Sequence, residues 1–276
     1  NGYDHISIAV DSVEETMEKI KAYPATPIND HWFSLPNGTL LGCTFNCELV
    51  RQLYEMTGLE LRLNRVDTLL GPGLNIHRNP LNGRNFEYIS EDPFLTGKMG
   101  AAQLQGLNIA GSTGTIKHFA ANNQETKRHE ADSIISVRAL REIYLKGFEI
   151  AVREAQPLSI MTSYNLLNGI HTANSHDLIQ GMARDEWGFK GVVMTDWFTS
   201  QDMPMITGKF KPAYPISAST GCIYAGNDIQ MPGCQKNVDD IVEAVKTGKE
   251  IDGYKITKAD LQFNAANVIR VAARTM

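Results

Sequence analysis

Short apolar runs rich in β-branched residues alternate along the chain with stretches whose apolar residues recur at helical spacing. The run Val192-Val193-Met194 is uninterrupted, which is typical of a strand buried on both faces of a sheet. From residue 138 to 154 the pattern is helical, because Leu140, Tyr144 and Phe148 fall on one stripe. Repeated strand–helix alternation predicts a parallel sheet covered by helices, an α/β fold.

The expected elements follow from these periods and from the turn residues between them. We expect strands at His5–Val10, Val66–Gly71, Thr113–Phe119, Leu158–Ser163, Gly191–Thr195 and Ala225–Met231. We expect helices at Ser12–Tyr23, Glu48–Leu63, Pro93 to about Gly106, Arg138–Glu154, Asp177–Trp187, Val238–Lys246 and Lys258–Arg274. The predicted loops are Phe33–Gly42 and Leu74–Pro93. About six strand–helix units result where a complete barrel has eight, so the expected fold is a (β/α)8 TIM-like barrel, incomplete or irregular.

A single domain is the simplest organisation for this chain. Its 276 residues suit one large core, and its 42% hydrophobic and 21% charged residues are close to the globular average. No internal repeat or low-complexity linker divides it. We therefore expect one barrel domain over residues 1–276.

Composition argues against several kinds of partner. The net charge is −5, the pI is about 5.8, and no Lys/Arg run is present, which disfavours nucleic acid and favours a neutral substrate. No apolar stretch approaches the ~20 residues that span a bilayer, so no membrane partner is expected. No signal peptide is visible, and we expect a cytoplasmic protein, although a truncated N-terminus would look the same. The four cysteines form no C-x-x-C pair and are expected to be free thiols.

Polar residues collect where the predicted strands end. The strand ends carry Lys117-His118, Ser163-Tyr164-Asn165 and Asp196-Trp197, and the loop after Gly73 adds Asn75, His77, Arg78, Arg84 and Glu87. The functional face of a parallel barrel lies at the carboxyl ends of its strands. The sequence therefore predicts a binding site where these side chains meet.

Asp196 is the sharpest candidate for chemistry. It directly follows an apolar strand, where an unpaired carboxylate is costly, so partners are expected. Lys117, His118 and Arg128 are the natural cations, and they would keep Asp196 ionised. A fixed, ionised carboxylate beside an aromatic side chain suits attack on the anomeric carbon of a sugar. The alternative is that Asp196 caps a following helix.

Simpler roles are also open for the other candidates. Lys117-His118 fits a strand-end ion pair with a nearby acid, and Arg84 with Glu87 fits a salt bridge within the loop. The histidines lack a metal-ligand spacing such as H-E-x-x-H, so no metal site is expected. The glycine-rich stretch 106–114 matches neither G-x-G-x-x-G nor a P-loop, and no cofactor is expected.

Several motifs, in their order and spacing, resemble those of family 3 glycoside hydrolases. They are LLGPGLNIHR at 69–78, GRNFEYISEDP at 83–93, KHFAANNQE at 117–125, MTSYN at 161–165, WGF at 187–189 and VMTDW at 193–197. The resemblance covers about residue 33 to the C-terminus. It is closer to the β-glucosidase/β-xylosidase branch, because the Lys-His-Phe-Pro-Gly-His-Gly motif of the hexosaminidase branch is absent.

This resemblance implies the barrel domain of a retaining, exo-acting β-glycosidase, with a β-linked glucoside or xyloside as substrate and β-glucosidase activity as the first expectation. Asp196 corresponds to the family's nucleophile. The residues that correspond to sugar contacts in the −1 subsite are Arg84, Lys117, His118, Arg128 and Tyr164, and Trp197 would line that subsite.

Two features depart from the family pattern. The glucosidase branch usually takes its acid/base Glu from a second α/β sandwich domain, which is absent from this chain, so a second domain or chain is expected to supply it. Glu87, Glu91 and Glu125 lie in barrel motifs that lack that role. Residues 1–32 match the family poorly: the Asp-Gly-Pro segment is missing, and Asp11 fits a helix N-cap better than the aspartate that grips the sugar.

Two other functions stay open. A barrel fragment that keeps its sugar contacts but is catalytically impaired without a partner domain would bind carbohydrate only. An unrelated barrel enzyme such as an aldolase would need a Schiff-base lysine, for which Lys117 is the candidate.

Overall fold

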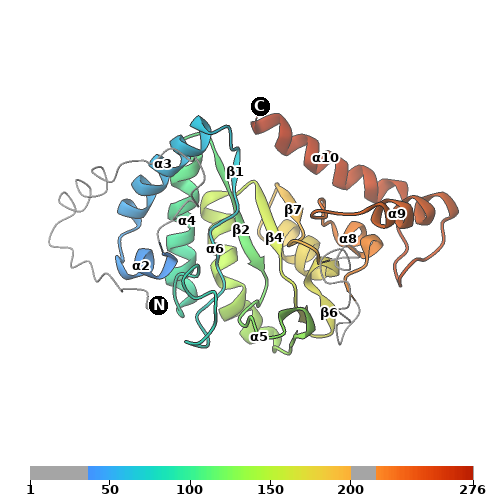
Figure 1. Cartoon of the computed structure of the whole chain (residues 1–276), viewed down its shortest axis with the longest axis horizontal. Helices are drawn as coiled ribbons and strands as arrows, with labels where there is room; N and C mark the ends of the chain where they lie inside the picture. Colours follow the sequence, from blue (N-terminus) through green and yellow to red (C-terminus); the bar gives the residue numbers. More distant parts are fainter. Residues whose placement is uncertain (1–36, 200–215, 276) are drawn as a thin grey trace, which may run out of the picture. The chain divides into compact units, whose positions relative to one another are not determined.

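The structure is a computed structural model, and it describes residues 37–199 and 216–275. The strand expected at His5–Val10, the helix expected at Ser12–Tyr23 and the capping residue Asp11 lie outside these ranges. Four parallel strands form the main sheet in the order β1-β2-β4-β7. They are β1 (Thr68–Leu69), β2 (Thr113–Phe119), β4 (Ser159–Thr162) and β7 (Val192–Met194). Figure 1 shows them side by side in the middle of the molecule.

A second, smaller sheet lies beyond the end of β4. It contains β3 (Asp132–Ser133), β5 (Leu166–Leu167) and β6 (Ile170–His171), in the order β3-β5-β6. The antiparallel β5 and β6 are joined by Asn168-Gly169, with φ of 50° and 88°. Positive φ at both central residues is the geometry of a tight hairpin turn, and Asn-Gly is the sequence that favours it.

Helices fill the connections between the strands. The α-helices are α2 (Gly38–Cys43), α3 (Cys47–Leu63), α4 (Pro93–Ile109), α5 (Val137–Ala139), α6 (Lys146–Ala155), α8 (Ser219–Ala225), α9 (Gln235–Thr247) and α10 (Lys258–Thr275). The others are the 3-10 turns η1 (Arg128–Glu130) and η3 (Thr172–Asn174) and the π-helical segments η2 (Leu140–Tyr144) and η4 (Asp177–Glu186). Local chemistry sets where two of them begin. The Asn46 side chain accepts from the Leu49 N–H at 3.0 Å, and the Asp92 side chain caps α4 just before Pro93.

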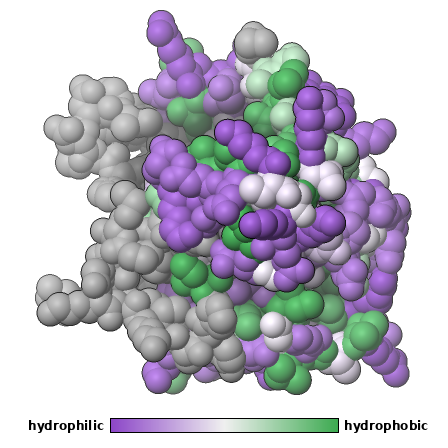
Figure 2. Space-filling model, turned by 90° about the vertical axis from the view of Figure 1, so that its right-hand side faces the viewer, coloured by the Kyte–Doolittle hydropathy of each residue, from purple (hydrophilic) through white to green (hydrophobic). Residues whose placement is uncertain are grey.

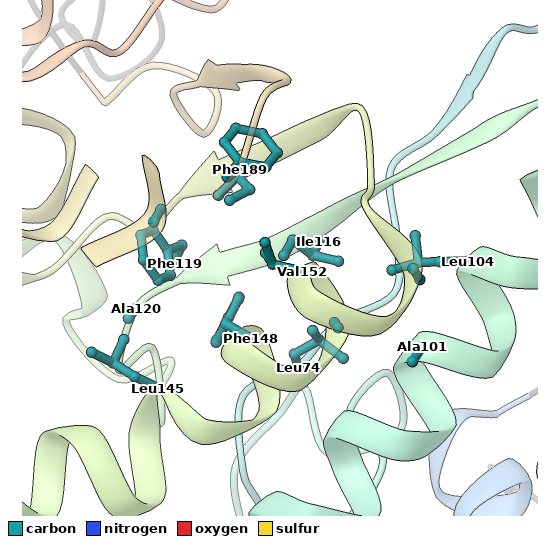
Figure 3. Packing of buried hydrophobic residues seen from close by; sticks show 14 of the residues in the cluster. Leu74, Ala101, Leu104, Ile116, Phe119, Ala120, Leu145, Phe148, Val152 and Phe189 are labelled. Atoms are coloured by element: carbon teal, nitrogen blue, oxygen red, sulfur yellow. The ribbon is translucent and has the colours of Figure 1, made fainter. Parts of the chain in front are cut away.

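The main core lies between the sheet and the helices α4 and α6. Figure 3 shows Ile116 and Phe119 of β2 facing Phe148 and Val152 of α6. The rings of Phe119 and Phe148 are 5.1 Å apart, and all four side chains are fully buried. This packing fixes β2, whose end carries two of the predicted site residues.

On the other side, α10 packs against β4 and β7. Val268 and Val271 contact a small cluster of Met161, Val192 and Met194. The outer face that bears α8, α9 and α10 is mainly hydrophilic, with hydrophobic residues scattered over it (Figure 2). In the described ranges, no helix is long and apolar enough to cross a membrane.

The α/β fold with a parallel sheet is confirmed, and the exceptions to the predicted elements are local. Phe33–Gly42 was predicted as loop, but Gly38–Cys43 is helix α2, which the Asn37 side chain caps. Ala225–Met231 was predicted as a strand, but helix α8 runs to Ala225 and only Ile229 makes a bridge, to Met194. The expected helices at 138–154 and 177–187 contain π-helical segments. The four-stranded sheet is open over the described residues rather than closed into a barrel.

Candidate active site

The predicted site residues come from five segments, one of which is η1 with Arg128. Lys117 and His118 lie near the end of β2, Tyr164 follows β4, and Asp196 follows β7. Arg84 lies in the long loop between β1 and α4. Because the strands are parallel neighbours, their carboxyl ends meet at one edge, and the structure brings Asp196, His118 and Tyr164 into contact there.

Asp196 is nearly buried, with 6% of its surface exposed. Its Oδ1 accepts from the Trp197 N–H at 2.7 Å, and the Tyr164 hydroxyl also donates to the carboxylate. Its Oδ2 lies 3.6 Å from His118 Nε2. Residues 197–198 form a turn, so within the described part of the chain Asp196 does not cap a helix. Burial raises the pKa of Asp196, and the Trp197 N–H, the Tyr164 hydroxyl and the charges of Arg84 and Arg128 oppose that rise.

His118 is held by neighbours on both its backbone and its ring. The Asn75 amide donates to the His118 carbonyl at 2.9 Å and accepts from its N–H at 2.8 Å. The Tyr88 hydroxyl lies 3.2 Å from Nδ1. Burial lowers the pKa of His118 well below its usual value, and the charges of Arg84, Lys117 and Arg128 add to this effect. His118 is therefore a neutral imidazole and not one of the cations that keep Asp196 ionised.

The cations beside Asp196 are held by two glutamates. Glu87 binds Lys117 at 2.7 Å and Arg84 at 2.9 Å, while Glu125 binds Arg128 at 2.7 Å and lies 4.0 Å from Arg84. Burial raises the pKa of Glu87, but Lys117 and Arg84 outweigh it, so the net shift is downward. The strand-end ion pair and the loop salt bridge considered from the sequence both exist. The expectation that Lys117 partners Asp196 is wrong, because Lys117 pairs with Glu87.

The Tyr164 ring lies near Asp196 and has two close neighbours. The Arg128 guanidinium lies 4.4 Å from its ring centre, and the His129 ring centre lies at 4.1 Å. Burial, followed by the Asp196 charge, raises the pKa of Tyr164, so its hydroxyl stays protonated and can donate. Trp197 is 46% exposed, and its ring centre lies 6.1 Å from that of Phe198.

Asp228 is another aspartate with a buried carboxylate, and its hydrogen bonds are typical of a structural role. Asp228 accepts from Arg184 Nη2 at 2.8 Å, from the Val193 N–H at 2.8 Å and from Asn267 Nδ2 at 2.9 Å. These donors tie η4, β7 and α10 together. Asp228 is thus fully engaged by the fold, whereas Asp196 presents an oxygen toward a ring at 3.6 Å.

Four further residues shape this site through contacts that were not predicted from the sequence. Tyr88 and Asn75 orient His118, Glu125 holds Arg128, and His129 packs on Tyr164. Three of them lie inside the recognised motifs, but spacing alone does not reveal which motif residues touch. Over residues 37–199 and 216–275, no group of three His, Cys, Asp or Glu side chains is arranged to hold a metal ion.

A buried carboxylate, a neutral imidazole and three fixed cations suit binding of a neutral, hydroxyl-rich ligand. The comparison with known families agrees with this geometry. The family model described as glycosyl hydrolase family 3 N terminal domain matches residues 26–271. The chain belongs to this family. The match begins before residue 33, where the motif resemblance started.

Relatives in this family are considerably longer than the chain. It is 51% identical over 240 residues to a β-glucosidase of Ruminococcus albus, covering 86% of this chain and 24% of that protein. It is 40% identical over 227 residues to an exo-α-(1→6)-L-arabinopyranosidase of Bifidobacterium longum, covering 80% and 30%. The structure of β-glucosidase 3B from Thermotoga neapolitana in complex with glucose matches with a TM-score of 0.77 and 38% identity, over 91% of this chain and 34% of that one. The chain spans about a quarter of the Ruminococcus protein.

Proposed function

We propose that this chain carries the sugar-binding and nucleophile half of a retaining β-glycosidase, with β-glucosides as its first substrates. The observation that carries the proposal is Asp196, a nearly buried carboxylate with one oxygen fixed by a backbone N–H and the other facing His118. Membership of family 3 supports the proposal, since Asp196 lies in the VMTDW motif, which resembles the family's nucleophile motif.

In the proposed reaction, Asp196 attacks the anomeric carbon while the bond to the leaving oxygen breaks, which forms a glycosyl ester on the carboxylate. Water then attacks the same carbon, releases the sugar and restores the carboxylate. Arg84, Lys117, His118, Arg128 and Tyr164 would bind sugar hydroxyls, and Trp197 would line the subsite. Contacts that strengthen as charge develops on the ring are the ones that raise the rate.

The acid that protonates the leaving oxygen needs a carboxyl group that is protonated in the Michaelis complex, about 5–5.5 Å from the nucleophile. Glu87 does not fit, because Lys117 and Arg84 lower its pKa and keep it ionised. Glu125 is engaged by Arg128 at 2.7 Å. We therefore propose that a second domain or chain supplies the acid/base Glu.

The choice of sugar rests on relatives alone. Several are named β-glucosidases, and two Bifidobacterium relatives at 40% and 41% identity are named exo-α-(1→6)-L-arabinopyranosidases. Relatives at about 40% sequence identity are therefore named for more than one sugar. Xylosides stay among the proposed substrates. A cytoplasmic location also stays a proposal.

The second candidate function is a barrel fragment that binds carbohydrate but is catalytically impaired without its partner domain. The ion pairs at Glu87 and Glu125 favour this candidate, since they hold the sugar-binding cations in place without any catalytic acid. The two candidates share the binding site and differ in whether Asp196 reacts.

A mechanism-based label separates the two. The chain is incubated with 2-deoxy-2-fluoro-β-glucosyl fluoride, whose activated leaving group needs no acid, and the adduct is located by peptide mass spectrometry. The expected result is one sugar on the peptide that contains Asp196, blocked by excess glucose and absent in Asp196→Asn. A label on another carboxylate would overturn the nucleophile assignment. Glucose binding without any label would favour the carbohydrate-binding fragment.

A further inference from the structure

A buried series of polar side chains leads away from Asp196 into the core. Asn122 Nδ2 donates to the Tyr88 hydroxyl at 3.1 Å, that hydroxyl lies 3.2 Å from His118 Nδ1, and His118 Nε2 lies 3.6 Å from Asp196 Oδ2. Exposure is 2% for Asn122, 0% for Tyr88 and 1% for His118. Neither Tyr88 nor Asn122 has a part in the proposed reaction, so their burial beside the site calls for an explanation.

The packing around Tyr88 places its ring close to the loop that follows β1. A Cβ at Gly73 would stand 2.8 Å from Cδ1 of Tyr88, so only glycine leaves room for the ring there. Tyr88 and His118 meet edge to face, with ring centres 6.1 Å apart and planes at 71°. This orientation directs the hydroxyl at the imidazole. The Asn75 bonds to the His118 backbone fix the other side of the contact.

A neutral imidazole carries its one proton on either Nδ1 or Nε2, and the hydrogen bond at one nitrogen selects the state of the other. Asn122 Nδ2 donates to the Tyr88 oxygen, which leaves the hydroxyl proton to be donated onward. Two acceptors lie within its reach, His118 Nδ1 at 3.2 Å and the backbone carbonyl of Asn122 at 3.4 Å, and the contact with the imidazole is the shorter one. Donation to Nδ1 leaves the imidazole proton on Nε2.

The other end of the ring favours the same tautomer. An ionised Asp196 has only acceptor oxygens, so a proton on Nε2 meets the carboxylate favourably. The opposite tautomer would turn the Nε2 lone pair toward a carboxylate oxygen, which repels it. The other groups that act on His118 are Arg84, Lys117 and Arg128, and all three favour the neutral ring. Both ends of the imidazole therefore select one state.

We propose that Tyr88 is a positioning residue that holds His118 as the Nε2–H tautomer, so that the imidazole presents a donor to Asp196 and to a sugar hydroxyl bound beside it. This inference rests on the proposed function only in the part that concerns Asp196 as nucleophile. The tautomer itself can be measured without any reaction.

The test uses the full chain labelled with ¹⁵N-histidine. Long-range ¹H–¹⁵N spectra distinguish the protonated ring nitrogen from the unprotonated one, and loss of a signal set in His118→Gln assigns His118 among the seven histidines. We expect Nε2–H in the unaltered chain and a mixture of tautomers in Tyr88→Phe. The matched control is Tyr54→Phe, because Tyr54 is also buried, at 4% exposure, but lies in α3. It should leave the His118 signals unchanged.

The rate of labelling by 2-deoxy-2-fluoro-β-glucosyl fluoride gives the second readout. Tyr88→Phe should slow the labelling of Asp196 about tenfold, the effect expected for one lost neutral hydrogen bond, and leave the labelled peptide the same. If Tyr88→Phe fails to fold, Asn122→Ala replaces it, because loss of the amide frees the hydroxyl to turn and should also mix the tautomers.

Two results would overturn the inference. One is an Nδ1–H tautomer in the unaltered chain, and the other is an unchanged Nε2–H tautomer in a folded Tyr88→Phe or Asn122→Ala. Failure of the proposed function looks different. In that case Asp196 takes no label in the unaltered chain while the tautomer results still stand.

Discussion

The buried position of the Asp196 carboxylate opposes folding when the group is ionised. Burial raises the pKa of Asp196, which means that the fold favours the protonated carboxyl over the ionised one. The protonated carboxyl group therefore contributes to the free energy of unfolding. This contribution is fully present below the ordinary aspartate pKa of 3.8 and is lost as the pH rises through the higher pKa of the folded state. Once the carboxyl group is ionised, the protein carries the cost of a nearly buried charge.

Asp196→Asn should remove that cost together with the chemistry. At pH 7 we expect the free energy of unfolding to rise by about 1 kcal/mol, or a few degrees in melting temperature, as is common when a strained functional group is neutralised. Labelling should fall by at least ~10³-fold, because no nucleophile is left. Urea melts at pH 7 and pH 3.5 check the sign, since the gain should shrink at the lower pH. A variant that is less stable at pH 7 would contradict the assignment.

Glu87 is the opposite case, because its pKa is lowered despite burial. Glu87→Gln leaves Lys117 and Arg84 without their shared partner, and we expect a loss of about 2 kcal/mol at pH 7. A depressed folded pKa stabilises the protein above the ordinary value of 4.5, and this is lost as the pH falls through the folded value. The difference in free energy of unfolding between Glu87→Gln and the unaltered chain should therefore become smaller as the pH falls.

The matched control for this prediction is Glu142→Gln. Glu142 pairs with Arg138 on the surface, with its side chain 59% exposed, so its loss should cost no more than about 0.5 kcal/mol. An equal loss in both variants would mean that the Glu87 pairs contribute no more than a surface ion pair. Denaturant melts of the three proteins over pH 3–7 make the comparison.

Residue identities were easier to predict than residue partners. Asp196 stands out because a carboxylate follows an apolar strand, and that signal is local in sequence. Which cation faces it depends on the loop between β1 and α4, where Glu87 captures Lys117. Tyr88 was missed as a partner of His118 for the same reason, since the two residues are 30 positions apart and no local pattern indicates their contact.

At the scale of elements, strong periodicity predicted position well and weak periodicity did not. The strand at Thr113–Phe119 and the helices α3, α9 and α10 appear within a few residues of their expected bounds. Helix α2 is only six residues long and follows a Pro-Asn-Gly turn signal, so its start looked like loop. All residues of α8 except Tyr224 are buried, which leaves no amphipathic stripe to detect.

The contact between α3 and α4 depends on glycine at one position. A Cβ at Gly106 would stand 2.2 Å from the Arg51 carbonyl oxygen and 2.7 Å from the Glu55 nitrogen, both of them backbone atoms of α3. Gly106→Ala should therefore push the helices apart and destabilise the protein by about 2 kcal/mol, despite the better helix propensity of alanine.

Gly181→Ala is the control for that substitution. Gly181 lies in η4 with no heavy atom within 4 Å of an added Cβ, so alanine should be neutral or should stabilise by roughly 0.5–1 kcal/mol. Thermal melts of both variants give the sign directly. Destabilisation of similar size at both positions would mean that close helix packing is not what requires glycine at 106.

At the scale of the whole molecule, the chain belongs to family 3 and its main sheet is open over the described residues. Over the described residues, the open sheet of β1, β2, β4 and β7 brings His118 and Asp196 together at its strand ends without a closed barrel. The chain spans about a quarter of the Ruminococcus β-glucosidase that it matches. If a second domain or chain supplies the acid/base, as proposed, this chain alone should keep those steps that need only the nucleophile and lose those that need the acid.

The dependence on leaving group tests this division. The chain should hydrolyse 2,4-dinitrophenyl β-glucoside, whose phenolate leaves without protonation. On methyl β-glucoside, its rate should be ~10²–10⁴-fold lower than that of an enzyme with its own acid, because general acid catalysis usually contributes a factor of this size. Its rate on the activated substrate should show no loss at high pH from deprotonation of an acid. Asp196→Asn should be inactive on both substrates, which excludes a contaminating glycosidase. Efficient turnover of methyl β-glucoside with a bell-shaped pH profile would mean instead that a carboxyl group of this chain is the acid, and each glutamate of the barrel motifs would then need to be replaced in turn.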